Sequence, residues 1–383
     1  MKLFKSLLIA PATLGLLAPM SATANELNLA EVSGYSSSEE VQNISEFYPK
    51  QLAVTNSRVD GLEARLNEVE AGSFSETTTA SFSSNFYIGS TNDDNGTTSS
   101  DLDDQIMAGY DFQIDLNTSF TGEDSLDISI DAGNAVGSGY AEFDPNATGD
   151  FLKVDGVSYT FPLGGATVFV GDNTDGSLLF TTACVYGGPS NTLDDCGNVN
   201  AGITGGAISA GASYDFGNGF TVASGLQTSQ EVLTEESLDG VALNAAYTGE
   251  SYGLSVTYSS VETSSTEEDT AVALNAYYTP EGLPSISVGY ETVDLGGVAS
   301  TSDEQESFFT GLTWDEVGPG SLGVALGYSN IVEGNDEEYM YEAYYEYPVN
   351  DGMTITPLIF IKEVAAAGQD DTTGAMIKTS FSF

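Results

Sequence analysis

The feature that most constrains the fold is a change of rhythm near residue 78. From there to the end of the chain, apolar and polar side chains alternate with a period of two, in sixteen short stretches rich in β-branched and aromatic residues. In the second stretch, Tyr110 and Phe112 share one face, whereas Asp111 and Gln113 share the other. This alternation is typical of β-strands whose two faces meet different surroundings.

The connections between these stretches alternate as well. Tight turns such as "TGED" (121–124) and "PVNDG" (348–352) follow the even-numbered stretches, and longer acidic segments follow the odd-numbered ones. A transmembrane barrel has short turns at one rim, long loops at the other and an even number of strands. We therefore predict an all-β fold, a 16-stranded antiparallel transmembrane β-barrel over residues 78–383. Its apolar face is expected to meet lipid, and its small, polar face is expected to be too hydrated to fill a core.

Aromatic residues recur where the even-numbered strands approach their tight turns. They are Phe161, Tyr214 or Phe216, Tyr247, Tyr278, Trp314 and Tyr347. Such a row is typical of the aromatic belt at a membrane interface. The last residue, Phe383, extends the row into the sixteenth strand, and Phe381 shares its face. The same parity turns Lys378 toward the lumen.

The first 72 residues follow a different pattern. Lys2 and Lys5, a short apolar run and the ending "SATAN" predict a signal peptide over 1–24, cleaved after Ala24. Residues 25–49 are polar. Residues 50–72 predict a short coiled-coil helix on the periplasmic side, and its a/d seam consists of Leu52, Val59, Leu62, Leu66 and Val69.

Composition excludes several functions. The chain has 57 acidic residues, 8 basic residues and no histidine. Without histidine it lacks Ser-His-Asp and Cys-His catalysis and the commonest metal ligand. Nucleic acid is disfavoured because its binding needs a basic surface. We predict no enzyme activity and no cofactor. The excess of acidic residues is also explained by a hydrated acidic surface suited to salty water, without any particular binding partner.

The third long connection, residues 172–205, stands apart. It is the longest, it carries the apolar run 178–180, and it contains Cys184 and Cys196. In an exported chain this pair predicts a disulfide, the alternative being two free thiols. A long loop with an apolar anchor is expected to fold inward and narrow a channel. The alternative is a surface loop that the disulfide protects from proteolysis.

Parity and loop position together predict a set of pore-lining residues. They are Asp111, Asp115, Asp127, Asp131, Glu342, Glu346, Lys362 and Lys378 from the strands, and Asp172, Asp175, Asp194 and Asp195 from the third loop. Lys153 is left unassigned because its strand changes phase. With so few cations opposite the acids, the lumen is expected to have a negative potential and to prefer cations.

The segments "MKLFKSLLIAPATLGLLAP" and "RVDGLEARLNEVEAGSFSETTTASF", followed by a barrel that ends in Phe, resemble the cyanobacterial outer-membrane porins, especially those of marine picocyanobacteria. The resemblance implies a homotrimeric diffusion channel, in outer-membrane lipid, for small hydrophilic solutes and inorganic ions. It also implies that Phe381 and Phe383 form the terminal signal read by the barrel-assembly machinery. These porins normally carry a surface-layer-homology domain, of which "ISEFYPKQLAV" (44–54) looks like a remnant.

A second interpretation is a structural tether. In this case a closed barrel would anchor the chain, and the N-terminal helix would carry the function.

Overall fold

The structure is a computed structural model that describes residues 78–92, 106–135, 142–143, 145–205, 207–229, 238–264, 267–296, 303–365 and 370–383. The predicted signal peptide, polar segment and coiled-coil helix lie outside these residues. None of the helices in the described segments has the length and apolar character to cross a membrane.

The described chain forms sixteen β-strands. They are β1 (Thr78–Asn92), β2 (Met107–Thr118), β3 (Ser125–Gly133), β4 (Lys153–Leu163), β5 (Ala166–Thr174), β6 (Ala207–Gly217), β7 (Phe220–Thr228), β8 (Gly240–Thr248), β9 (Tyr252–Ser264), β10 (Glu267–Tyr278), β11 (Ser285–Asp294), β12 (Glu304–Val317), β13 (Gly320–Val332), β14 (Met340–Asn350), β15 (Met353–Lys362) and β16 (Thr372–Ser382).

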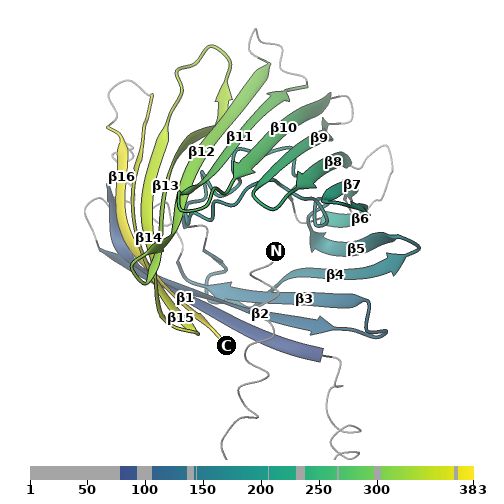
Figure 1. Cartoon of the computed structure of the whole chain (residues 1–383), viewed down its shortest axis with the longest axis horizontal. Helices are drawn as coiled ribbons and strands as arrows, with labels where there is room; N and C mark the ends of the chain where they lie inside the picture. The colour runs from purple at the N-terminus through teal and green to yellow at the C-terminus, as the bar shows by residue number, and fades with distance from the viewer. Residues whose placement is uncertain are drawn as a thin grey trace, which may run out of the picture. The chain divides into compact units, whose positions relative to one another are not determined.

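Each strand pairs antiparallel with its neighbours in sequence, and β16 pairs with β1 to close the barrel (Figure 1). The closing seam extends to the last residue. The N–H of Phe82 donates to the carbonyl of Phe383 at 2.9 Å, and the N–H of Phe383 donates back to the carbonyl of Phe82 at 3.0 Å. The predicted closed 16-stranded antiparallel barrel is confirmed.

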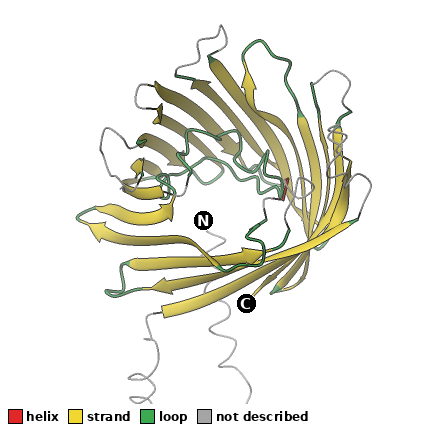
Figure 2. Cartoon of the chain, turned by 180° about the vertical axis from the view of Figure 1, so that it is seen from behind, coloured by secondary structure: helices red, strands yellow, loops and turns green. Residues whose placement is uncertain are grey.

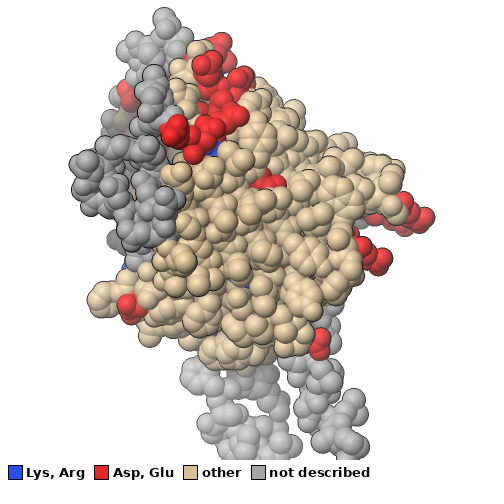
Figure 3. Space-filling model, turned by 90° about the vertical axis from the view of Figure 1, so that its left-hand side faces the viewer, with Lys and Arg blue, Asp and Glu red and all other residues tan. Residues whose placement is uncertain are grey.

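The two faces of the wall differ as the alternation predicts. In β8, Val241 and Leu243 are exposed on the outer face (49% and 60%), whereas Ala242 and Asn244 point inward and are buried. Figure 3 shows one side of the barrel, where few charged side chains interrupt the wall and the acids gather mainly toward one end. The outer face is therefore an apolar belt, which suits a hydrocarbon environment.

The inner face departs from the expectation of a uniformly small and polar surface. On β12 to β16 it carries large apolar side chains, which join an internal cluster with residues of the loops. The members from these strands are Phe309, Ala325, Met340, Tyr344, Leu358, Phe360 and Met376. The prediction was wrong for this part of the barrel, because a loop inside the lumen supplies the apolar surface against which these side chains pack.

The connections alternate in length, with one exception. Tight turns follow the even-numbered strands; residues 164–165, 218–219 and 351–352 are examples. Between β9 and β10, however, only residues 265–266 separate Ser264 from Glu267. The acidic stretch 262–269, expected to be a loop, is mostly strand, because β9 and β10 continue their pairing to Glu267.

Aromatic side chains line the rim that carries the tight turns. Phe120 contacts Tyr159, Tyr214 contacts Phe216, and Phe220 contacts Tyr247. At the seam the ring of Phe383 stacks on Phe82 with centroids 5.7 Å apart. Phe381 meets Phe86 edge-on at 6.0 Å. The final residue of the chain thus contributes both backbone pairing and an aromatic contact.

Candidate functional site

The third long connection lies inside the barrel. It leaves β5 after Thr174 and returns to β6 at Ala207, and its ribbon crosses the interior in both views (Figures 1 and 2). On its way out, backbone N–H groups bond to small polar side chains of the wall. Thr181 donates to Asn244 Oδ1 at 3.1 Å, and Ala183 donates to Ser255 Oγ at 2.9 Å. This limb therefore follows the inner face of β8 and β9.

Further along, the outgoing limb reaches β11 and then β14. The N–H groups of Val185 and Tyr186 both donate to Ser287 Oγ, at 3.0 and 3.2 Å. The Tyr186 hydroxyl donates to Glu342 Oε1 at 2.6 Å. Burial, followed by the neighbouring Glu342 carboxylate, raises the pKa of Tyr186 well above its ordinary value. The hydroxyl therefore stays protonated and keeps donating to Glu342.

The returning limb is held by two inward side chains. Asn275 Nδ2 donates to the carbonyl of Cys196 at 2.8 Å. The carboxylate of Glu291, fully buried on β11, accepts hydrogen bonds from the Asn200 N–H, the Asn200 side-chain amide and the Ala201 N–H, at 2.7–3.0 Å. Charge-assisted bonds of this kind are stronger than neutral ones. Glu291 was not among the predicted site residues; its inward parity within β11 was the available signal.

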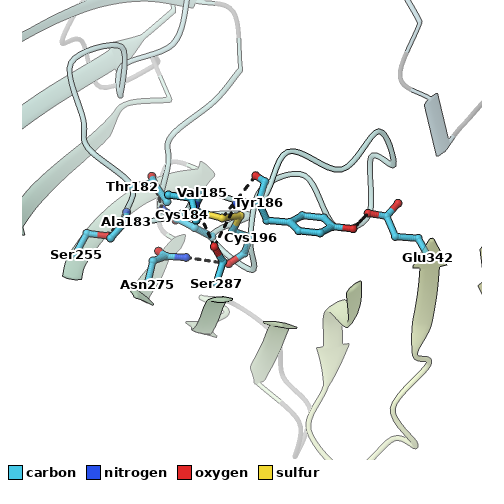
Figure 4. The surroundings of a disulfide bond; sticks show 11 residues. Thr182, Ala183, Cys184, Val185, Tyr186, Cys196, Ser255, Asn275, Ser287 and Glu342 are labelled. Atoms are coloured by element: carbon cyan, nitrogen blue, oxygen red, sulfur yellow. Dashed lines mark hydrogen bonds between the residues drawn. A yellow bond between two sulfur atoms is a disulfide. The ribbon is translucent and has the colours of Figure 1, made fainter. Parts of the chain in front are cut away.

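A disulfide links the two limbs of the loop. Cys184 and Cys196 are bonded, with 6.5 Å between their Cα atoms (Figure 4). The predicted disulfide is confirmed. It lies between the Ser287 contact on the outgoing limb and the Asn275 contact on the returning limb, so that it joins two segments that are each bonded to the wall.

Small residues of the wall give the loop room. A Cβ added at Gly289 would lie 1.7 Å from the carbonyl oxygen of Cys196, and one at Gly311 would lie 2.6 Å from the Tyr186 ring. Neither distance is compatible with packing. The glycines on the inner face of β11 and β12 are therefore explained by the close approach of the loop backbone and the tyrosine.

On β2 to β5 the wall carries acids. Asp115 Oδ1 accepts hydrogen bonds from Gln113 Nε2 at 2.8 Å and from Ser129 Oγ at 2.7 Å. A cavity of about 640 Å³ lies beside β3, β4 and the start of the third loop, and Asp127, Asp155 and Asp175 are among its lining residues. We call this part of the inner wall, with the inward side chains of β2 to β5, the acidic wall.

A β-bulge places one acid that the parity argument missed. Ser129 pairs with Gly156 and Ile130 pairs with Val154, so Asp155 is the extra residue of β4. The bulge also explains why the phase of Lys153 could not be assigned, since it returns this lysine to the inner face, in register with Asp131. Asp131 itself is 6% exposed.

The other predicted pore-lining residues occupy different surroundings. Asp111 is buried and accepts from Asn85 Nδ2 at 2.8 Å and from the Tyr87 hydroxyl at 2.7 Å. Glu342 points inward but is only 4% exposed beneath the loop. Asp172 lies in β5, in register with Val157 on the outer face, and not in the loop.

The remaining members are distributed along the loop and the last strands. Asp194 and Asp195 are exposed on the loop, and Glu346 is exposed on β14. The Lys378 ammonium lies 6.0 Å from the centroid of the Tyr87 ring. Lys362 Nζ lies 2.8 Å from Glu142 Oε1. The structure thus gathers Asp115, Asp127, Asp131 and Asp175 on or beside the acidic wall, and it separates them from Glu342.

Among the described residues, no group of three or more Cys, Asp or Glu side chains is arranged to hold a metal ion.

Comparison with known proteins identifies the fold. No family model matches the chain. An uncharacterized protein of Nostoc sp. strain PCC 7120 is 23% identical over an alignment that covers 90% of this chain and 72% of that protein. Two engineered variants of the porin of Rh. blastica match 80% of this chain and all of theirs, at 13% identity, with TM-scores of 0.53 and 0.54. Pseudomonas putida OprB matches with a TM-score of 0.53, at 13% identity, over 80% of this chain and 94% of its own. The chain therefore has a porin-like barrel fold.

Proposed function

We propose that the protein is an outer-membrane porin, a passive diffusion channel for small hydrophilic solutes and inorganic ions. The observation that carries this proposal is the arrangement inside the closed barrel. A loop bonded to one side of the inner wall leaves a polar cavity beside the opposite, acidic side. An apolar outer belt with an aromatic rim supports a membrane setting.

The passage is proposed to prefer cations. The acidic wall and the adjoining start of the third loop carry Asp115, Asp127, Asp131, Asp155 and Asp175. Among the described residues of this wall, the basic one is Lys153. Rings or walls of carboxylates raise the local concentration of cations and repel anions. Because the loop faces the acidic wall with Leu178 and Leu179 at the cavity, it narrows the passage without adding opposing positive charge.

The porin resemblance extends the proposal to assembly and location. We propose a homotrimer in the outer membrane, exported through the signal peptide 1–24 and recognised by the barrel-assembly machinery through Phe381 and Phe383. Residues 50–72 would form a coiled coil on the periplasmic side, and 25–49 would be the remnant of a surface-layer-homology region.

Planar-bilayer recording on the purified chain tests the function. With KCl at unequal concentrations on the two sides, we expect stepwise currents and a reversal potential whose sign indicates cation preference. A reversal potential that indicates anion preference would contradict the cation proposal alone. A folded barrel that conducts no current would contradict the channel and favour the structural tether.

A further inference from the structure

The third loop has a second partner besides the wall that it follows. Glu142 and Phe143 belong to the connection between β3 and β4, and in the barrel wall β2, β1 and β16 lie between β3 and β15. This connection contacts residues of several other elements. Phe143 is 4% exposed and meets the Tyr87 ring of β1 with centroids 5.6 Å apart. The Asn146 N–H, just beyond it, donates to Asp111 Oδ2 of β2 at 3.3 Å.

Glu142 lies at the centre of a compact set of contacts. Its carboxylate accepts from the Thr192 N–H at 3.2 Å and from Thr192 Oγ1 at 2.8 Å, and it pairs with Lys362 Nζ at 2.8 Å. Lys362 Nζ also donates to Thr192 Oγ1 at 3.0 Å. The backbone carbonyl of Glu142 accepts from the Asn191 N–H at 3.0 Å. We call Glu142, Thr192 and Lys362 the Glu142 cluster.

The cluster joins three separate parts of the chain. Glu142 comes from the β3–β4 connection, Thr192 from the turn of the third loop, and Lys362 from the end of β15. The Lys362 and Glu142 side chains are 38% and 12% exposed, so the pair is partly withdrawn from water. Among the described residues this is the one ion pair, and both of its members also bond to Thr192 in the turn of the loop.

We propose that Glu142 is a positioning and selectivity-determining residue of the channel. It holds the turn of the third loop against β15, which sets the width of the passage. It also neutralises Lys362, which removes a positive charge from a lumen that the acidic wall makes cation-preferring. This inference rests on the proposed channel function, because width and selectivity have meaning only for a conducting barrel.

Two single substitutions separate the mechanical effect from the electrostatic one. Glu142→Gln and Lys362→Met both break the ion pair, so both loosen the turn of the loop. They change charge in opposite directions: the first leaves Lys362 uncompensated, and the second leaves Glu142 uncompensated. We therefore expect both variants to raise the mean single-channel conductance. Cation preference is expected to fall in Glu142→Gln and to rise in Lys362→Met.

The expected size follows from the partial exposure of the pair. Loss of a partly exposed ion pair lowers the ratio of held to released loop about five-fold, which corresponds to roughly 1 kcal/mol. In bilayer records this appears as more frequent transitions to a larger conductance level. The double variant Glu142→Lys with Lys362→Glu restores an ion pair in the reverse sense and is expected to return the conductance toward that of the original chain.

Lys378→Met is the matched control, because it removes a positive charge from the lumen side without touching the Glu142 cluster. It is expected to raise cation preference without new conductance levels. Equal conductance in Glu142→Gln, Lys362→Met and the original chain would overturn the inference while leaving the channel function intact. So would conductance that stays raised in the reversed pair. Absence of current in the original chain would instead refute the proposed function. Heat-modifiable migration on gels confirms that each variant is folded before recording. Thr192→Val is a further variant, which is expected to loosen the turn of the loop while both charged residues stay in place.

Discussion

The inner wall of this barrel has two sides that differ in almost every property. On β8 to β14 the wall bonds to the third loop through small polar side chains and a buried carboxylate, and it makes room with glycines. On β2 to β5 it carries carboxylates beside a cavity. The strands of both sides show the same alternation of apolar and polar residues. The alternation alone therefore does not decide which inward residues are covered by the loop and which face water.

This difference shows that inward polar side chains in such a barrel have two different roles. Ser255, Ser287 and Asn275 point inward as Asp127 does, yet they satisfy the backbone of the loop instead of facing solute. Buried backbone groups need partners, and a loop within a lumen can obtain them only from the wall or from water. The covered side therefore has a structural task, and in the proposed channel the acidic wall is the side available to permeating ions.

The largest effect is expected from removing the covering itself. Deletion of residues 178–198 takes away most of the third loop, including both cysteines. We expect single-channel conductance to rise several-fold, because Ser255, Asn275 and Glu291 then line a wider hydrated lumen. Conductance recording of the folded variant measures this. An unchanged conductance would show that the loop does not narrow the passage.

A somewhat smaller effect is expected from the buried carboxylate of the covered side. Glu291→Ala leaves the N–H groups of Asn200 and Ala201 without their acceptor, and each buried unsatisfied donor costs about 1–3 kcal/mol. We expect the returning limb to detach, seen as faster proteolysis of the loop in an otherwise folded barrel. Asp294→Asn, on the same strand but exposed, is the control and is expected to leave the proteolysis rate unchanged.

A direct test of the comparison uses charge. Asp127→Asn together with Asp155→Asn is expected to lower cation preference, because it removes two negative charges from residues that line the cavity. Glu342→Gln removes one carboxylate buried under the loop, and its effect on the reversal potential is expected to be smaller than half that of the double variant. If the two variants shift the reversal potential by equal amounts per charge removed, the covered and acidic sides do not differ for ions.

The sequence was sufficient for the barrel and insufficient for the lumen. Strand number, pairing and face follow from local alternation, which every strand repeats, and the disulfide follows from two cysteines in one loop. The partners of the loop are different in kind. Nothing local distinguishes Glu291, which binds the loop, from Asp127, which lies beside the cavity, because the difference depends on where residues some 90 positions away fold back.

Asp155 and Asp172 show the limit of parity in a single strand. A β-bulge adds one residue to β4 and puts Asp155 beside the cavity, and β5 extends far enough to place Asp172 on the outer face. Bulges and strand ends depend on pairing with neighbours, which alternation within one segment does not record. The Glu142–Lys362 pair is separated by 220 positions and had no counterpart in the sequence analysis.

The smallest expected effect concerns the tight turn below the acidic wall, between β2 and β3. Asp124 is buried there; it accepts from the Tyr159 hydroxyl at 2.6 Å and from the Thr121 N–H at 2.7 Å. The pKa of Asp124 is held well below its usual range, chiefly by the hydrogen bond from Tyr159 and also by those from Thr121 and Ser119. A carboxyl group with a lowered folded-state pKa stabilises the folded form above its unfolded pKa, about 4, and loses this contribution as the pH falls further.

Amide hydrogen exchange in residues 119–124 should therefore accelerate below about pH 4, beyond the intrinsic dependence of exchange on pH. Tyr159→Phe removes the main cause of the lowered pKa, so it should make this acceleration smaller, while the segment 179–186 on the covered side keeps its protection over the same range. Loss of protection in both segments at the same pH would show that the two sides of the barrel open together and would contradict their independence.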